Sequence, residues 1–171
     1  MMPHSLPKVV FTDIDGVWTD GGMYYDQQEN EWKKFNTRDS AGVLFLRKCN
    51  IPLVILTGEN TRIMERRAQK LKIEHCYQGV KDKVAVAKEF CLKMGVDIQD
   101  TAFIGDDIID MALMAEVGFS GCPSDAASYV QKRAHVVLNS KGGEGAFREF
   151  VEVILDRANL LEQTVLSIYS A

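Results

Sequence analysis

The sequence predicts an α/β fold, a doubly wound, Rossmann-like sandwich built on a parallel sheet. Short apolar segments alternate with segments of helical length through short links, which is the pattern of such folds. Several of the short segments, such as Leu53-Val54-Ile55-Leu56, are continuously apolar, as strands buried on both faces are. The length of 171 residues, 46% of them hydrophobic and 26% charged, fits one globular domain spanning 1–171.

Six strands and six helices are expected, in alternation along the chain. The strands are predicted at 8–12, 52–56, 75–77, 102–104, 117–120 and 135–137. The helices are predicted at 40–48, 61–70, 83–94, 108–115, 126–132 and 146–160. After Leu160 the residues mix apolar and polar types, which fits either a continuing helix or an arm that binds a partner subunit.

The segment 18–37 departs from this alternation. It contains paired glycines at 21 and 22, then Met23-Tyr24-Tyr25, a polar stretch at 26–30, and a second aromatic stretch from Trp32 to Phe35. Two aromatic segments around a polar turn predict a β-hairpin. Because the hairpin directly follows the first strand, we expect it to form a flap beside the end of that strand.

Composition excludes several classes of protein. The net charge of −4 provides no basic patch, so neither a nucleic acid nor a membrane is an expected partner. No apolar segment approaches the ~20 residues of a membrane span, and the first residues lack a signal-peptide pattern, which predicts a cytoplasmic protein. The cysteines and histidines show no metal-ligand spacing, so we expect reduced thiols and no zinc site; they are Cys49, Cys76, Cys91, Cys122, His4, His75 and His135.

Two acidic segments follow predicted strands. Asp13 and Asp15 end the first apolar segment, ahead of Gly16, and residues two apart on a strand point to the same side. Alone, this pattern also fits ordinary turn residues. The second segment, Gly105-Asp106-Asp107-Ile108-Ile109-Asp110, follows another apolar run in the same way. Together they predict an anionic site for a divalent cation at the carboxyl edge of the sheet.

The order of polar residues at strand ends resembles the haloacid dehalogenase superfamily of phosphotransferases. The matching motifs span almost the whole chain: Asp13-Ile14-Asp15, then Thr57 after a second strand, then Lys83 at a helix start, then Gly105-Asp106-Asp107 with Asp110. All four motifs of that superfamily are present. The resemblance therefore implies a phosphoryl-transfer enzyme.

The resemblance implies a role for each of these residues. Asp13 is the expected nucleophile, which forms an aspartyl-phosphate, and Asp15 the expected general acid and base. An aspartate at position 15 favours a phosphatase over a transferase. Thr57 is expected to donate a hydrogen bond to a phosphoryl oxygen. Lys83 is expected to neutralise the charge shared by phosphate and nucleophile, with Lys81 as the competing candidate.

The resemblance also implies Mg²⁺ as the cofactor. Its expected ligands are Asp13, Asp106 and the backbone carbonyl of Asp15, all of them oxygens, as a hard cation requires. Asp107 and Asp110 are expected to orient the ligands or the lysine. For Asp110 the alternative is a surface position in the first helical turn.

The spacing of the motifs leaves no room for a cap domain. Only 44 positions separate Asp13 from Thr57 and 26 separate Thr57 from Lys83, enough for the flap, one helix and one strand. The segments 35–40, which includes Arg38, and 142–149 are similar to the tetrameric phosphatases of 3-deoxy-2-keto sugar acids, whose type member acts on 3-deoxy-D-manno-octulosonate 8-phosphate. This resemblance implies a sugar-acid phosphate substrate, Arg38 among its contacts, and a homotetramer assembled through the flaps.

One residue departs from that group. Octulosonate phosphatases usually have arginine after Thr-Gly, whereas this chain has Glu59. A helix that starts here would bring Glu59, Arg66, Arg67 and Lys70 close together, either as an exposed ion-paired face or as a substrate site. Our hypothesis is that Glu59 contacts hydroxyl or amino groups while Arg67 or Lys70 binds the substrate carboxylate. That hypothesis favours a nine-carbon substrate, 2-keto-3-deoxy-D-glycero-D-galacto-nononate 9-phosphate (KDN 9-phosphate), with N-acetylneuraminate 9-phosphate and octulosonate 8-phosphate as alternatives.

Two non-catalytic classes of protein fit these residues less well than an enzyme does. A phosphorylation-switched receiver domain also combines aspartates, Thr, Lys and Mg²⁺, but its acidic pair and its phosphorylated aspartate lie on different early strands. A silent relative that only binds sugar phosphates is expected to lack Asp13 or Asp15, and both are present.

Overall fold

The computed structural model describes residues 5–169 and contains one six-stranded parallel sheet. The strand order is β5-β4-β1-β6-β7-β8, and every neighbouring pair is parallel. The strands are β1 (Val9–Thr12), β4 (Leu53–Leu56), β5 (His75–Tyr77), β6 (Thr101–Ile104), β7 (Phe119–Cys122) and β8 (Val136–Val137). The predicted doubly wound α/β fold is confirmed.

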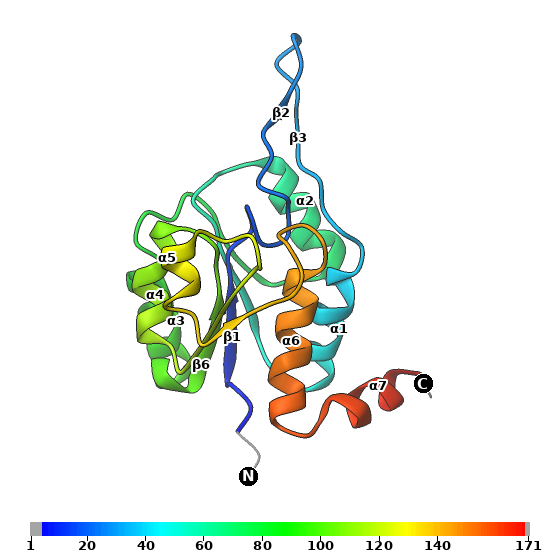
Figure 1. The fold of residues 1–171 in the computed structure, drawn as a ribbon, viewed down its shortest axis with the longest axis vertical. Coiled ribbons are helices and arrows are strands. Elements are labelled where there is room, and N and C mark those ends of the chain that lie inside the picture. The colour runs from blue at the N-terminus through cyan, green and yellow to red at the C-terminus, as the bar shows by residue number, and fades with distance from the viewer. Residues whose placement is uncertain (1–4, 170–171) are drawn as a thin grey trace.

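Helices cover both faces of this sheet (Figure 1). One layer consists of α1 (Asp39–Lys48), α2 (Arg62–Leu71) and α6 (Ala146–Arg157). The other consists of α3 (Lys83–Met94), α4 (Met111–Glu116) and α5 (Ser128–Gln131). Two short 3₁₀ helices, η1 (Ile98–Asp100) and η2 (Ile108–Asp110), precede β6 and α4. No helix within residues 5–169 is long and apolar enough to cross a membrane.

The central strand shows why its sequence is continuously apolar. Val10 packs into the core beneath α1, α2 and α6, whereas Val9 and Phe11 pack into the core beneath α3, α4 and α5. All three side chains are fully buried. Just beyond the strand, Trp18 stacks on Phe147 of α6 with ring centroids 4.3 Å apart, which anchors the start of the flap to the domain.

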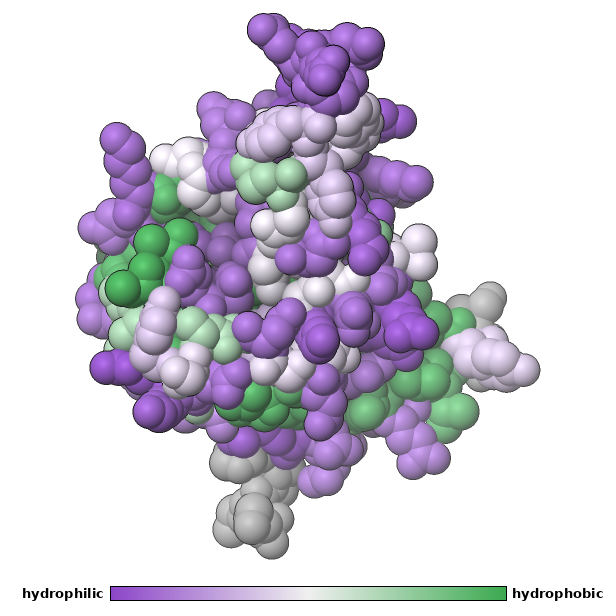
Figure 2. Space-filling model, turned by 45° about the horizontal axis from the view of Figure 1, so that its top comes forward, coloured by the Kyte–Doolittle hydropathy of each residue, from purple (hydrophilic) through white to green (hydrophobic). Residues whose placement is uncertain are grey.

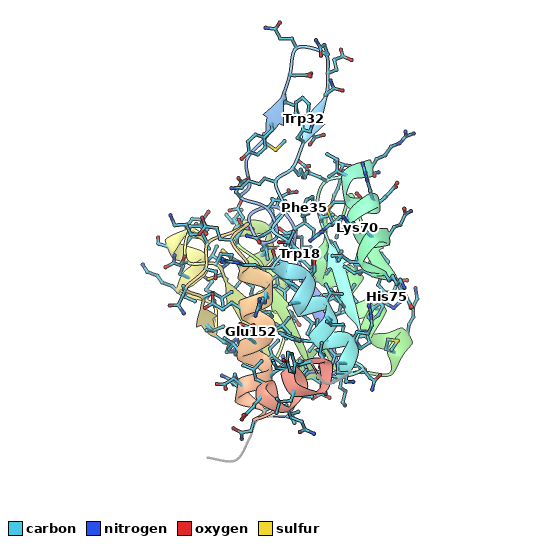
Figure 3. All side chains as sticks on the ribbon, turned by 90° about the vertical axis from the view of Figure 1, so that its right-hand side faces the viewer. Trp18, Trp32, Phe35, Lys70, His75 and Glu152 are labelled. Carbon is cyan, nitrogen blue, oxygen red and sulfur yellow. The ribbon has the colours of Figure 1, made fainter. Side chains whose placement is uncertain are left out.

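The flap is a short antiparallel hairpin of β2 (Tyr24–Tyr25) and β3 (Glu31–Trp32). Its turn is stabilised by Asp26, whose carboxylate accepts hydrogen bonds from the backbone N–H groups of Gln28 and Asn30 at 2.8 and 2.9 Å. The hairpin projects from the carboxyl edge of the sheet (Figure 1), and its tip is hydrophilic (Figure 2). Figure 3 shows Trp32 on the hairpin, with Phe35 and Trp18 lower down, where it joins the domain. The hairpin predicted within 18–37 is confirmed.

The C-terminal region differs most from the prediction. The helix expected at 146–160 ends at Arg157, because Asn159 adopts a left-handed conformation with φ 58° that breaks it. A separate helix, α7 (Leu161–Tyr169), then packs against α1 and α6. Its buried Thr164 lies 3.6 Å from the sulfur of Cys49. Within the described residues this segment is therefore a helix docked on its own domain.

Smaller differences concern element boundaries. The strand expected at 117–120 begins two residues later, at Phe119, and the helix expected at 126–132 covers only Ser128–Gln131. The helix expected at 108–115 begins as the 3₁₀ turn η2. All four cysteines are free, and Cys91 and Cys122 are buried. His4 lies outside the described residues.

Candidate active site

The carboxyl ends of β1 and β6 lie side by side where the strand order reverses. After β1 the chain adds β4 and β5 on one side of that strand, and it then returns through α3 to place β6 on the other side. Open α/β sheets bind their ligands in the crevice outside such a point. Asp13 follows β1 and Asp106 follows β6, so the topology brings the two acidic segments together.

Gly16 allows these segments to approach closely. Its φ is +80°, and a Cβ at this position would collide with the carboxylate of Asp106. The glycine-rich loop before α6 packs on the other side, where a Cβ at Gly142 would collide with the carbonyl oxygen of Gly16. The N–H of Gly143 donates to the carbonyl of Val17 at 3.0 Å. The glycines at 16, 142 and 143 therefore pack three separate segments around the acidic site.

Lys83 joins two of the aspartates from the first position of α3. Its ammonium lies 2.9 Å from Oδ1 of Asp13 and 2.7 Å from Oδ1 of Asp110. Asp82 begins the helix by accepting a hydrogen bond from the N–H of Ala85, which fixes where Lys83 leaves the backbone. Asp110 is fully buried, so the alternative of a surface position is wrong.

Asp110 is also fixed by the backbone. Its Oδ2 accepts hydrogen bonds from the N–H groups of Asp106 and Asp107 at 3.0 and 3.2 Å. Both of its oxygens are therefore used within the protein, one by the lysine and one by the backbone. Asp107 itself is exposed, and its carboxylate accepts from the N–H of Ile108 and the hydroxyl of Tyr129.

Burial and mutual repulsion disfavour the charged forms of these carboxyl groups. Burial, then the charge of Asp110, raises the pKa of Asp13 to about 7, although Lys83 opposes the shift. Burial and the charges of Asp13 and Asp110 raise the pKa of Asp106 to about 8. One ammonium is thus too little positive charge for three carboxylates.

The cluster has the chemistry of a divalent cation site. Oxygens of Asp13, Asp106 and Asp110 lie within 4.8 Å of one another. Oδ1 of Asp106 is buried and has no hydrogen-bond partner in the described structure. Because both oxygens of Asp110 are used, Asp13 and Asp106 are the side chains with oxygens free for a metal, and carboxylate oxygens suit a hard cation. The Asp15 side chain is not a member of this cluster, and its carbonyl as a ligand stays a prediction.

The remaining phosphate-binding candidates lie at neighbouring strand ends. Thr57 follows β4 and is buried, and its hydroxyl accepts a hydrogen bond from the N–H of Glu59 at 3.4 Å. Lys81 is exposed, whereas Lys83 contacts Asp13. Lys83 is therefore the lysine placed at the acidic cluster.

Asp15 is held from the flap. The ammonium of Lys33 lies 2.6 Å from Oδ1 of Asp15 and 2.6 Å from Oε2 of Glu59. The hydroxyl of Thr19 also approaches Oδ1 of Asp15, at 3.3 Å. The expectation that Glu59 shares a helix face with Arg67 and Lys70 is wrong, because Thr61 caps α2 and leaves Glu59 in the loop before the helix.

The cationic substrate-binding candidates are spread over three places. Arg67 lies beneath the flap, where its guanidinium is 5.4 Å from the ring centroid of Phe35 and donates to the carbonyl of Asn36 at 3.2 Å. Lys70 is exposed on α2, facing a groove toward α1. Arg38 is exposed and lines a surface cavity beside the start of α6. The structure does not bring these three side chains together.

Comparisons with known proteins give a consistent assignment. The model of the haloacid dehalogenase-like hydrolases matches residues 77–150. The 3-deoxy-D-manno-octulosonate 8-phosphate phosphatase of Yersinia pestis is 40% identical over 155 residues, which cover 91% of this chain and 83% of that protein. The chain belongs to this phosphatase family. It is thus a haloacid dehalogenase-type phosphatase, as the motifs predicted.

Solved structures of this family have the same fold. A probable phosphatase from Pseudomonas syringae superimposes with a TM-score of 0.91 at 37% identity. The aligned region covers 97% of this chain and 94% of the Pseudomonas chain. The octulosonate 8-phosphate phosphatase of Moraxella catarrhalis was solved with magnesium, phosphate and the KDO sugar acid. It superimposes with a TM-score of 0.90 at 30% identity, and the aligned region covers 95% of this chain and 93% of the Moraxella chain. The hairpin after β1 and the lack of a cap are therefore features of the phosphatase family.

Sequence reasoning missed two polar residues of this phosphatase, Lys33 beside Asp15 and Asp39 at the start of α1. Lys33 resembles any charged residue on an exposed hairpin, and no local signal points to its two carboxylate partners. Asp39 is fully buried, and its carboxylate accepts the N–H of Arg148 at 3.0 Å in the first turn of α6. Burial raises the pKa of Asp39 to about 6, opposed by backbone hydrogen bonds and by Arg67. Its position directly before the first predicted helix was the available signal.

Proposed function

We propose that this protein is a Mg²⁺-dependent phosphatase that hydrolyses 3-deoxy-D-manno-octulosonate 8-phosphate. The observation that carries the proposal is the cluster of Asp13, Asp106 and Asp110, in which the buried Lys83 pairs with Asp13 and Asp110. It occurs in a chain that matches octulosonate 8-phosphate phosphatases over about nine tenths of its length. That agreement favours the eight-carbon acid over the nine-carbon acid expected from Glu59.

Mg²⁺ is proposed because the unpartnered Oδ1 of Asp106 and the neighbouring carboxylate of Asp13 provide the hard, anionic ligands that it prefers. The related Moraxella enzyme was solved with a magnesium ion. When bound, the cation supplies charge that offsets the repulsion between a carboxylate and a phosphate dianion. The carboxyl groups with raised pKa values are those that gain most from that charge.

In the proposed reaction, a carboxylate oxygen of Asp13 attacks phosphorus, and the bond from phosphorus to the sugar oxygen breaks. Asp15 gives a proton to that oxygen, which leaves as the alcohol of the sugar acid. Lys83 neutralises charge on the phosphoryl group, and the hydroxyl of Thr57 donates to a phosphoryl oxygen. Water, deprotonated by Asp15, then cleaves the aspartyl-phosphate and releases inorganic phosphate.

KDN 9-phosphate is the second candidate substrate, and Glu59 is the observation in its favour. The carboxylate of Glu59 is 35% exposed at the rim of the site, where it can accept hydrogen bonds from hydroxyl groups. Its ion pair with Lys33 also gives Glu59 a role within the protein, which weakens the argument for substrate selection. N-acetylneuraminate 9-phosphate remains the third candidate.

The substrate is tested by kcat/KM with Mg²⁺ on all three sugar-acid phosphates. We expect octulosonate 8-phosphate to give the highest value. A preference for a nine-carbon acid that Glu59→Arg abolishes would instead assign the second candidate and the role of Glu59 in selecting it. No turnover of any of the three would reject the proposed substrate class.

We also propose a homotetramer assembled through the flaps. The hairpin projects away from the core and carries four exposed apolar or aromatic side chains: Met23, Tyr24, Tyr25 and Trp32. Contiguous exposed residues of this kind are typical of interaction sites. Light scattering should give four times the chain mass, and Tyr25→Ser with Trp32→Ser should lower it. A monomeric wild-type protein with full activity would reject the tetramer.

The cytoplasmic location and the single domain over 1–171 stay predictions.

A further inference from the structure

Two lysines differ from the other lysines that form salt bridges, because their side chains are buried. Among salt bridges between described residues, the side chains of Lys33 and Lys83 are each 2% exposed. The other lysine side chains in such pairs, at positions 8, 34, 88 and 93, are at least half exposed. Exposed pairs contribute little, whereas a buried ammonium must be fully paired to be tolerated. The burial of Lys33 therefore points to a function beyond the solubility of the flap.

Both buried lysines have the same arrangement of partners. Lys83 bridges Asp13 and Asp110, and Lys33 bridges Asp15 and Glu59. In each case one carboxylate belongs to the pair that follows β1, and the other comes from a separate segment. The second carboxylate holds the ammonium in place. Lys33 thus has the same relation to Asp15 that Lys83 has to Asp13.

The contact with Lys33 restricts Asp15 to one orientation. Oδ1 of Asp15 is within hydrogen-bonding distance of both Lys33, at 2.6 Å, and the hydroxyl of Thr19, at 3.3 Å. No hydrogen bond between described residues reaches Oδ2 of Asp15. That oxygen is therefore the one left for a proton transfer. Glu59 fixes the other side of the ammonium at 2.6 Å, so the flap and the loop after β4 set the position together.

We propose that Lys33, anchored by Glu59, is a positioning residue that orients Asp15 for proton transfer to the leaving oxygen. The proposal rests on the proposed function, in which Asp15 is the general acid. It makes the flap part of the catalytic apparatus of its own chain, because Lys33 directly follows β3. Glu59 then acts through Lys33, whether or not it also contacts the substrate.

The leaving group provides the test. A sugar alkoxide is a poor leaving group and needs the proton from Asp15, whereas p-nitrophenolate leaves readily without one. The ratio kcat/KM includes only steps up to cleavage of the ester bond, so it reports the acid role and not the later attack of water. A misoriented Asp15 should therefore lower kcat/KM for the sugar-acid phosphate and spare p-nitrophenyl phosphate.

The experiment compares Lys33→Met with the parent protein on octulosonate 8-phosphate and p-nitrophenyl phosphate, with saturating Mg²⁺. Lys34→Met is the matched control, because Lys34 is the next flap lysine and its side chain is 64% exposed. Its one salt-bridge partner among the described residues is Asp20, at 3.5 Å. We expect Lys33→Met to lose on the order of 100-fold on the sugar phosphate and less than about 10-fold on the aryl ester. Lys34→Met should change neither value.

Two further variants separate positioning from other effects. Removing Lys33 alone leaves two carboxylates facing each other, so Lys33→Met with Glu59→Gln should show the same selective loss if orientation is the cause. Glu59→Gln alone keeps the lysine and should give a smaller loss with the same selectivity. It also tests the proposal if Lys33→Met does not fold.

Each outcome has a definite meaning. Equal losses on both esters, or no loss, would overturn the role of Lys33. Turnover of p-nitrophenyl phosphate by the parent protein without turnover of any sugar-acid phosphate would reject the proposed substrate. In that case a crystal structure of Lys33→Met decides the inference: a rotated Asp15 carboxylate supports it, and an unchanged one overturns it.

Discussion

Replacing Asp106 with asparagine should stabilise the metal-free protein. Asp106 is half-buried beside Asp13 and Asp110, and its buried Oδ1 has no partner within residues 5–169. These surroundings raise its pKa from 3.8 to about 8. A raised pKa means that the folded state binds the proton more tightly than the unfolded state. The charged form therefore costs stability, and this cost grows as the pH rises from 4 to 8.

The size of the effect follows from the shift. Linkage between pKa values of 3.8 and about 8 gives a cost of roughly 4 kcal/mol at pH 7 and under about 2 kcal/mol at pH 5. Asp106 is not completely buried, and solvent screens part of its charge, so we expect Asp106→Asn to gain about 2 kcal/mol at pH 7. The gain should shrink at pH 5, where Asp106 of the wild type is protonated.

Urea unfolding followed by circular dichroism measures this difference. In EDTA at pH 7 the variant should unfold at a higher urea concentration than the wild type. Adding Mg²⁺ should stabilise the wild type much more than the variant, because the cation binds the folded state through the removed carboxylate. Equal stability of the two proteins in EDTA, or equal stabilisation by Mg²⁺, would refute the account of the acidic cluster.

Three further perturbations test other parts of the structure. Lys83→Met should abolish turnover and lower the free energy of unfolding by about 3 kcal/mol, because Asp110 loses its buried partner. Phosphate release measures the turnover and urea unfolding measures the stability. Retained activity would contradict the role of Lys83. Asp39→Asn should reduce the pH dependence of stability. A pKa of about 6 in the folded state favours the protonated form, so between pH 4 and 7 the wild type should lose about 2 kcal/mol more than the variant in urea unfolding. Parallel curves would exclude Asp39 as the cause. Trp18→Ala should cost about 3 to 5 kcal/mol in urea unfolding, because Trp18 is 1% exposed against Phe147, and a cost below 1 kcal/mol would show that the flap base is not anchored there.

The sheet and the acidic cluster were predictable because local signals determine them. Continuous apolar segments mark strands that are buried on both faces, and residues that follow such strands gather at one edge of a parallel sheet. Asp13 and Asp106 could therefore be placed together from their positions alone. The end of α6 near Asn159 could also have been predicted, since asparagine commonly ends helices in the left-handed conformation.

Contacts between distant segments could not be read in this way. Lys33 and Glu59 lie 26 positions apart, and neither differs locally from a solvated charge. The position of Glu59 was mistaken because Thr61, two residues later, is the residue that caps α2. Arg67 could be assigned to a helix, but only the fold shows that it lies against Phe35 beneath the flap. Side-chain pairing across segments depends on the tertiary packing, which no local pattern encodes.

In the proposed function, Asp13 acts with a bound divalent cation to hydrolyse a sugar-acid phosphate. Release of inorganic phosphate from octulosonate 8-phosphate tests it most directly, measured with Mg²⁺ and with EDTA for the wild type and Asp13→Asn. We predict turnover only by the wild type with Mg²⁺, with kcat/KM for Asp13→Asn lower by at least about 1,000-fold. Turnover that survives in Asp13→Asn, or that is unchanged in EDTA, would contradict the account.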